Sequence, residues 1–298
     1  MADIMDWRRP LLLALAAFPY LTPAKVANMA RCSLEERRRV ALPRSRPYVL
    51  FLDVTNSCNL RCPYCPTGAR RESGRSRNLM DLAIVRRLMD EMGSYLISVN
   101  LFNWGEPMLH PQLAAIIDLC HGRGVFTQLS TNLSIGRGER LVELCGSELD
   151  YMMVSISGAS QQVYSRYHRG GEVDLVFENL RRIVELKRAG KHRKPYVEVK
   201  YLCFKHNMHE VDLVRSRARK IGVDLFRHVI AGGAEEDILD QGEAPPRKLH
   251  TRYCRQLWST LVLEPDAGLA PCCCVFQGRR LREIFTKVHP GNQAQRAL

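Results

Sequence analysis

Apolar residues in this chain fall into short runs that alternate with amphipathic segments. Residues 48–54 form a nearly continuous apolar run, the pattern of a strand buried on both faces. Similar runs recur along the chain, and segments with helical periodicity separate them. Asp81 is placed to cap the first of these helices. The predicted strands span residues 48–54, 96–102, 125–130, 151–157, 196–204 and 224–230, and the predicted helices span residues 81–92, 111–121, 139–145, 175–189 and 211–221.

Strands that alternate with helices through short connections predict an α/β fold with a parallel sheet, open or closed into a barrel. In such folds the functional side chains gather at the carboxyl ends of the strands. Glycine and proline mark a linker after the last strand. We therefore expect an N-terminal helical extension, a core, a linker and a small cysteine-containing appendage, at residues 1–46, 47–231, 232–250 and 251–298 respectively.

The start of the chain superficially resembles a signal peptide, because Arg8 and Arg9 precede an apolar stretch. That stretch reaches residue 21 at most, which is too short to span a bilayer. No small-residue cleavage pattern closes it. We expect a helix docked on the core, with contact to a membrane surface as the alternative.

Composition is that of a globular protein, with 46% apolar residues and enough of them to bury a substantial core. The 44 Lys and Arg residues outnumber 31 Asp and Glu residues, which gives a net charge of +13. This charge favours an anionic partner. The alternative is a solvated basic surface, because the Arg residues are scattered along the chain.

Three of the eleven cysteines, Cys58, Cys62 and Cys65, follow the first predicted strand with the spacing CxxxCxxC. Thiolates are soft ligands suited to iron–sulfur clusters. Three of them can bind three corners of a four-iron cluster and leave the fourth iron open. A zinc site is the alternative, but zinc requires four ligands and no Cys or His nearby completes the set. Such thiolates indicate a reducing compartment, and we expect a cytoplasmic protein.

Other polar residues also follow predicted strands. Residues 103–107 follow the second strand, residues 130–132 end the third, and Ser155 and Ser157 end the fourth. Convergence at one rim is the layout of a site built on a barrel. Each feature also has a structural interpretation: residues 103–107 as a surface turn, Ser130 and Asn132 as caps, and Arg166 and Arg169 as solvated charges.

On these residues the chain resembles a radical S-adenosyl-L-methionine (SAM) enzyme. CxxxCxxC with an aromatic residue before its third cysteine, here Tyr64, is the signature of that family. Residues 104–107 (Trp-Gly-Glu-Pro) resemble its Gly-Gly-Glu-Pro turn, and residues 130–132 resemble its segment after the third strand. The resemblance covers residues 46–230, with partial similarity over 251–275. It implies a partial (β/α)6 TIM-like barrel, a 4Fe–4S cluster and bound SAM.

The resemblance also implies roles for the rim residues. Glu106 would accept from the methionine ammonium of SAM, and Gly105 and Pro107 would shape the turn beside it. Arg169 would pair with the SAM carboxylate in a charge-assisted contact. Tyr64 would contact the adenine. The predicted cofactor-binding residues are Tyr64, Gly105, Glu106, Pro107, Ser130, Asn132, Ser155, Ser157 and Arg169, with Ser155 or Ser157 on the ribose hydroxyls or the carboxylate.

The appendage resembles the opening of a SPASM or twitch extension, because Cys254, Gly268 and Cys273 fit the spacing CX9–15GX4C. A hairpin would bring its cysteines together. Relatives continue with further cysteines, whereas this chain has none after Cys274. Cys272 and Cys274 could act as substitute ligands of an auxiliary cluster. The alternative is a truncated appendage without a second cluster.

The prediction is therefore an oxidoreductase-type radical SAM enzyme. It would cleave SAM reductively to a 5′-deoxyadenosyl radical that takes hydrogen from an unidentified substrate, and the basic charge favours an anionic one. The reaction would be an oxidation, crosslinking or rearrangement in natural-product, peptide or sugar biosynthesis. A flavodoxin- or ferredoxin-type protein would donate electrons. The alternatives are a non-catalytic iron–sulfur carrier, an RNA-binding protein or a degenerate radical SAM protein. Glu106 and its turn favour the enzyme, because a carrier needs no ammonium acceptor.

Overall fold

A computed structural model describes residues 8–69, 78–136, 138–191, 193–231, 254, 256–270 and 273. Its centre is one eight-stranded sheet in the order β6-β5-β4-β3-β2-β1-β7-β8, in which all neighbours are parallel except β7 and β8. The strands are β1 (Val49–Leu52), β2 (Ser98–Asn100), β3 (Phe126–Thr131), β4 (Tyr151–Ile156), β5 (Tyr196–Cys203), β6 (Leu225–Ile230), β7 (Thr260–Leu263) and β8 (Leu269–Ala270).

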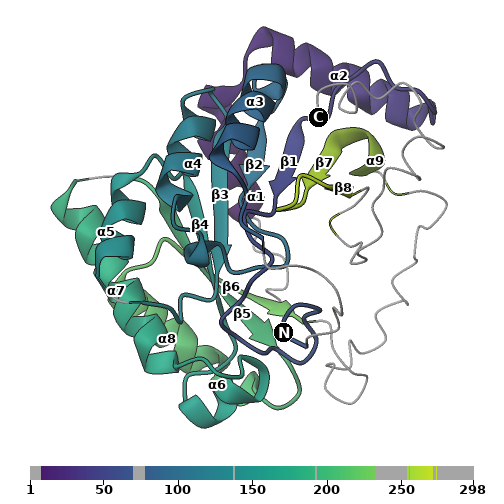
Figure 1. Ribbon diagram of the computed structural model, residues 1–298. Coiled ribbons are helices and arrows are strands. Elements are labelled where there is room, and N and C mark those ends of the chain that lie inside the picture. The colour runs from purple at the N-terminus through teal and green to yellow at the C-terminus, as the bar shows by residue number, and fades with distance from the viewer. Residues whose placement is uncertain are drawn as a thin grey trace.

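Helices that connect β1 through β6 cover one face of this sheet (Figure 1). Their apolar faces and the strand residues that point toward them form the main core. This arrangement confirms the predicted partial (β/α)6 barrel. The connecting helices are α3 (Leu82–Met92), α4 (Leu113–His121), α5 (Glu139–Gly146), α6 (Gln161–Tyr167), α7 (Val173–Ala189) and α8 (Val211–Ile221), with short 3-10 turns η2 (Pro107–Leu109) and η3 (Met208–Glu210).

The predicted elements of the barrel are present, with ends displaced by a few residues at most. Asp81 caps α3 as expected, since its carboxylate accepts from the Ala83 N–H at 2.8 Å. The sequence missed α6, a helix of seven residues that Ser160 caps. A helix this short gives no clear periodicity.

The region after the predicted linker joins the sheet itself. β7 lies parallel to β1, and the Asp53 N–H donates to Leu263 O at 2.9 Å. β7 and β8 then form the predicted hairpin. The sequence did not predict that this hairpin extends the edge of the barrel. Residues 232–250, the predicted linker, lie outside the described residues, and the division of the chain into domains stays a prediction.

The N-terminal extension consists of α1 (Arg8–Ala17), η1 (Phe18–Tyr20) and α2 (Pro23–Arg37). It packs on two parts of the molecule. Tyr20 contacts Phe126 at the amino end of β3, and α2 contacts α9 (Gln256–Ser259), the short helix before β7. The Trp258 indole N–H donates to Val40 O at 3.0 Å. The described helices include none with the length and apolar character needed to cross a membrane.

Candidate functional site

The three cysteines lie on the loop that leaves the carboxyl end of β1. Cys62 is buried, and Cys58 and Cys65 are half-buried. The Cys65 N–H donates to Cys62 O at 3.2 Å, and the Leu60 N–H donates to Cys58 Sγ at 3.4 Å. The loop packs tightly on itself, since a Cβ on Gly68 would lie 2.5 Å from the Cys62 nitrogen. The chain itself therefore gathers the thiols.

The surroundings of these thiols suit a metal cluster. Burial raises the pKa of Cys58 to about 12, and the nearby charges of Glu106 and Cys65 add to that effect. Burial also raises the pKa of Cys62, and the other two cysteines raise it further. Three thiolates this close together need a cationic partner to remain deprotonated. Their soft sulfur donors fit iron–sulfur chemistry.

A site for a single metal ion fits less well. Within the described residues, no three His, Cys, Asp or Glu side chains converge closely enough to hold one ion. A four-iron cluster does not require such convergence, because each thiolate binds a different iron atom. The donor set therefore fits the predicted 4Fe–4S cluster at Cys58, Cys62 and Cys65.

The turn after β2 lies directly against the exit of β1. The Glu106 N–H donates to Ser57 O at 2.8 Å. A Cβ on Gly105 would come within 1.7 Å of Thr55 O, so this approach requires glycine. Pro107 begins η2 and is buried. Gly105, Glu106 and Pro107 therefore fix the turn beside the cysteine loop, where the sequence predicted it.

Glu106 is the centre of a hydrogen-bond network, and its side chain is buried. Its Oε1 accepts from Met108 N–H at 3.1 Å and from Thr131 Oγ1 at 2.7 Å. Its Oε2 accepts from Asn132 N–H at 2.8 Å. Burial raises the pKa of this carboxyl, and these three donors oppose the rise. A carboxylate has about four acceptor positions, so one position on Oε2 is left.

Asn132 connects the end of β3 to the cysteine loop. Its Nδ2 donates to Asn59 Oδ1 at 2.9 Å and lies 4.0 Å from Cys58 Sγ. Its Oδ1 accepts from the Ser134 N–H at 2.8 Å, the pattern of an Asx turn. The Asn132 side chain thus holds the loop in place. Thr131 lies in the predicted segment 130–132 but without an assigned role, and Asn59 was not predicted, since their partners are distant in the chain.

The serines predicted at the rim have different surroundings. Ser157 is fully buried, and its Oγ lies 2.7 Å from His168 Nδ1, so it fastens α6 to the end of β4. Ser155 is half-buried, two residues beyond Met153 on the same side of β4. Ser130 is also half-buried and pairs in register with Met153. Ser130 and Ser155 therefore belong to the concave, inner side of the sheet.

Aromatic side chains flank the cysteine loop. The Tyr64 ring stacks on Tyr167 with centroids 6.2 Å apart and lies 6.0 Å from the ring of Phe204. The three cysteines add to the effect of burial in raising the pKa of Tyr167, which places its hydroxyl near them. Tyr167 was not predicted, because it lies on the unrecognised helix α6. Ser160, a capping residue after a strand, was the available signal.

Arg169 also lies beside the cysteine loop. Its carbonyl oxygen accepts from the Arg61 N–H at 2.9 Å. Its guanidinium is close enough to lower the pKa of Cys62, against the larger effect of burial. Arg169 is exposed. The rim therefore has a cation next to the predicted cluster ligands.

The concave side of the barrel holds further charges that the sequence did not identify. Glu198 is fully buried, and it accepts from Arg9 Nε at 2.9 Å, Arg227 Nε at 2.8 Å and Tyr151 Oη at 2.6 Å. Lys200, two residues along β5 on the same face, pairs in register with Arg227 and with a rim serine of β4. Burial lowers the pKa of Lys200. Of these four charged side chains, three are cations.

The appendage cysteines are described only in part. Cys254 is exposed, and Cys273 is half-buried with its Sγ 3.4 Å from Gln256 Oε1. With the Asn103 amide turned to satisfy both of its neighbours, this amide donates to Cys273 O at 3.2 Å. Cys273 therefore lies near the turn after β2. Cys272 and Cys274 lie outside the described residues, and an auxiliary cluster stays a prediction.

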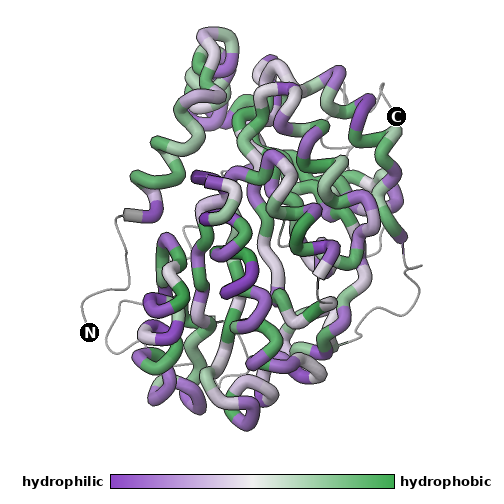
Figure 2. The backbone as a smooth tube through the Cα atoms, turned by 90° about the vertical axis from the view of Figure 1, so that its left-hand side faces the viewer, coloured by the Kyte–Doolittle hydropathy of each residue, from purple (hydrophilic) through white to green (hydrophobic). Residues whose placement is uncertain are grey.

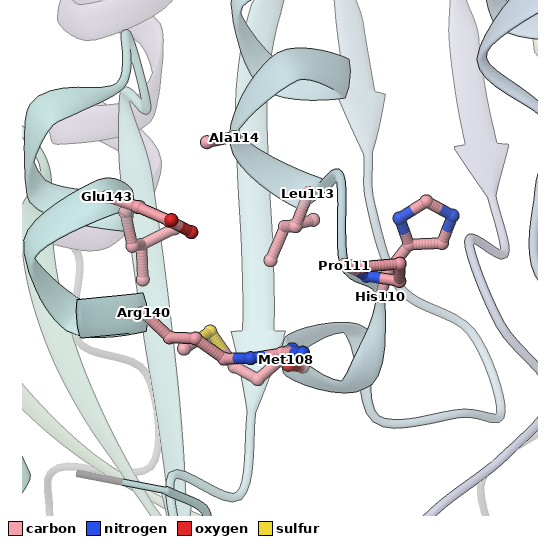
Figure 3. A pocket seen from close by; sticks show the side chains of 8 residues that line it. Met108, His110, Pro111, Leu113, Ala114, Arg140 and Glu143 are labelled. Carbon is pink, nitrogen blue, oxygen red and sulfur yellow. Dashed lines mark hydrogen bonds between the residues drawn. The ribbon is translucent and has the colours of Figure 1, made fainter. Parts of the chain in front are cut away.

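A small pocket lies on the helical side of the sheet, between α4 and α5 (Figure 3). Arg140 extends across its mouth toward Met108. Its lining residues are Met108, His110, Pro111, Leu113, Ala114, Arg140, Glu143 and Leu144. None of the predicted site residues lines this pocket, so we place the candidate site at the rim.

Several curated proteins are similar to part of this chain. The PqqA peptide cyclase of Bradyrhizobium diazoefficiens is 26% identical over 133 residues, which cover 45% of this chain and 34% of that protein. The tungsten-containing aldehyde ferredoxin oxidoreductase cofactor-modifying protein of Pyrococcus furiosus is 25% identical over 181 residues, with coverages of 59% and 49%. The chain thus spans about a third to a half of the length of these relatives.

Solved structures share the fold at low identity. SuiB of Streptococcus suis bound to S-adenosylmethionine superposes with a TM-score of 0.63 and 12% identity, covering 88% of this chain and 70% of that one. The structure of anSMEcpe with bound AdoMet gives a TM-score of 0.55 and 13% identity, with coverages of 85% and 83%. A family model described as the Radical SAM superfamily matches residues 52–216, more than half of the chain. This chain belongs to the radical SAM superfamily.

Proposed function

We propose that this protein is a radical SAM enzyme that abstracts hydrogen from its substrate. The observation that carries the proposal is the meeting of the cysteine loop with the Glu106 turn at one rim of the barrel. Gly105 allows the two segments to touch, and Asn132 joins both to the end of β3. An electron carrier has no need for a buried carboxylate held beside three thiols.

Cys58, Cys62 and Cys65 would hold the 4Fe–4S cluster. With SAM bound, such a cluster would supply the electron for reductive cleavage to methionine and a 5′-deoxyadenosyl radical that would take a hydrogen atom from the substrate. The chain's own contribution is orientation and exclusion of water. The aromatic rings of Tyr64, Tyr167 and Phe204 cover one side of the loop.

Glu106 would receive the methionine ammonium of SAM. Three of its acceptor positions are already occupied by the chain, which holds the carboxylate still. The remaining position on Oε2 would accept the ammonium in a charge-assisted hydrogen bond. Arg169, exposed beside the loop, would pair with the SAM carboxylate. Ser130 and Ser155, on the concave side, would reach the ribose hydroxyls.

The substrate is proposed to carry an anionic group, and a peptide is the first class to test. Lys200 and Arg227 leave the inside of the barrel with more positive than negative charge. Two relatives are named for peptides, the PqqA peptide cyclase and SuiB bound to its precursor peptide SuiA. We keep the predicted oxidoreductase-type reaction, a cytoplasmic location and a flavodoxin- or ferredoxin-type electron donor as parts of the proposal.

The test is cleavage of SAM by the anaerobically reconstituted protein with dithionite as reductant. Formation of 5′-deoxyadenosine is measured by chromatography, and iron content and the electron paramagnetic resonance signal report the cluster. Cys62→Ala should abolish both the signal and the product. Cys145→Ala is the matched control, because Cys145 is a half-buried thiol at the far end of α5. A fully loaded cluster that yields no 5′-deoxyadenosine would refute the proposal.

A further inference from the structure

Exposed apolar side chains are concentrated in the N-terminal extension. Leu11, Leu15 and Phe18 expose 49%, 61% and 71% of their surface, and Val26 and Leu34 expose 43% and 47%. Leu42 is exposed as well. The described chain exposes eleven large apolar side chains, and these six fall within residues 8–46. Single exposed apolar residues are ordinary, but such a concentration marks an interaction surface.

These side chains form regular faces on the helices. Leu11, Leu15 and Phe18 are four and three residues apart, so they share one side of α1 and the turn that follows it. Val26 and Leu34 are eight residues apart, about two turns, and share one side of α2. We call Leu11, Leu15 and Phe18 the N-terminal apolar face.

Other side chains already attach the extension to the body of the protein. The Tyr20 hydroxyl donates to Asp150 Oδ1 at 2.5 Å, and the Lys25 ammonium donates to Gly124 O at 2.5 Å. Cys32 is buried and donates to Trp258 O at 3.2 Å. The N-terminal apolar face is therefore not needed to hold the extension on the body of the protein. Figure 2 shows the helix next to the N-terminal trace at the outside of the molecule, largely hydrophobic in colour.

The charges of the N-terminal extension are mostly positive. Residues 8–46 contain nine Lys and Arg residues against two Glu residues. Glu35 is engaged internally, since its carboxylate accepts from the Ser45 hydroxyl and from the backbone N–H groups of Arg44 and Ser45. Residues 10–24 carry no charged side chain at all. Exposed arginines then follow at positions 31, 37, 38, 39 and 44.

We propose that the N-terminal apolar face docks this protein on the surface of an anionic membrane. Apolar side chains on short helices enter the boundary between headgroups and acyl chains, and flanking arginines attract anionic lipids at about 1 kcal/mol each. An exposed apolar face on α1, with exposed arginines on the same N-terminal extension, complements such a surface. No described helix could span the bilayer, so the contact is interfacial. This inference is independent of the radical chemistry.

The test uses the full-length, cluster-loaded protein and sedimentation with phosphatidylcholine vesicles, with or without one quarter phosphatidylglycerol. We expect binding to the anionic vesicles that weakens at high salt. Replacing Leu11, Leu15 and Phe18 together by Ser should weaken it at least tenfold. The matched control replaces Val142 and Leu213 by Ser, because these side chains are equally exposed, at 50% and 58%, but lie on α5 and α8.

The triple variant should keep the circular dichroism and the SAM cleavage of the parent protein, because about half or more of each of the three side chains is exposed and none belongs to the described core clusters. Unchanged vesicle binding in this variant would overturn the proposal, as would equal binding to vesicles without phosphatidylglycerol. The proposal also fails if the protein ignores vesicles and light scattering shows a dimer that the triple substitution converts to a monomer. That face would then be an interface between two copies.

Discussion

The two ends of the barrel differ in how their polar and charged groups are paired. At the carboxyl end, three thiols, one buried carboxylate and several backbone N–H groups meet in loops. At the amino end, the buried Asp150 accepts from Tyr20, from the Lys194 ammonium and from both Thr127 donors. Charges at the amino end are balanced by partners within the chain. At the carboxyl end, the Glu106 carboxylate and the cysteine thiols could bind a ligand.

We therefore expect the amino end to contribute mainly to stability and the carboxyl end mainly to chemistry. A buried carboxylate that accepts several hydrogen bonds is costly to remove, so the amino end contributes to holding the extension and the strands together. The rim instead holds thiols and a carboxyl group whose ionised forms are disfavoured by burial, which is typical of functional sites. Substitutions at the amino end should therefore change the free energy of unfolding. Substitutions at the rim should change cluster loading and SAM cleavage.

The largest expected effect is that of Gly105→Ala. The new methyl group would overlap Thr55 O and push the Glu106 turn away from the cysteine loop. We expect SAM cleavage to fall by more than about a hundredfold, from a barrier increase of about 3 kcal/mol, with a loss of cluster-bound iron. Gly146→Ala is the control, since nothing lies within 4 Å of its Cβ position. Normal iron content and cleavage in Gly105→Ala would remove the basis for our site.

The next effect is on stability at the opposite end. Asp150→Ala would leave the buried Thr127 donors without their acceptor, at a cost of about 1–3 kcal/mol for each in the free energy of unfolding. The Lys194 side chain is 41% exposed and can turn to solvent, so it adds little to this cost. Urea unfolding measures this loss. Asp90→Ala, which removes an exposed partner of Arg123, should cost about 1 kcal/mol or less.

Cleavage of SAM per folded molecule should stay unchanged in Asp150→Ala, because the substitution is at the far end of the strands. A selective loss of cleavage in a variant that remains folded would show that the two ends are coupled. The amino end would then contribute to the chemistry as well as to stability.

The smallest effect is a dependence on pH. Burial alone would raise the pKa of Glu198, but Arg227, Tyr151 and Arg9 outweigh it and lower the pKa below the ordinary value of about 4.3. The charged form therefore stabilises the fold above that value, and this stabilisation is lost as the pH falls through the lowered pKa.

Glu198→Gln should accordingly be less stable than the parent protein at pH 7, and the difference should shrink on acidification. Urea unfolding at several pH values below 7 measures it. Glu91→Gln, in an exposed i,i+4 pair with Arg87, should differ little from the parent at any pH. A difference for Glu198→Gln that stays constant with pH would contradict the assigned role.

The barrel could be predicted because its strands are continuous apolar runs and its helices are amphipathic over several turns. The positions of the cysteine loop and the Glu106 turn could be predicted because each is a contiguous motif that follows a strand. Thr131, Tyr167 and Lys200 could not, since each becomes part of the site only through folding. Thr131 reaches Glu106 from the neighbouring strand, and Lys200 faces its neighbours through sheet register. The curated relatives match only part of this chain, so its substrate cannot be inferred from them.

The pairing of β7 with β1 has a consequence for synthesis of the chain. Val49 pairs with Thr260, 211 residues later. During synthesis on the ribosome, β1 can pair with β2 early, but its other edge stays unpaired until the β7–β8 hairpin has been made. An unpaired apolar strand edge is a template for pairing with another chain. Nascent chains truncated before residue 260 should therefore be prone to aggregation, and those that include β7 should be protected from it.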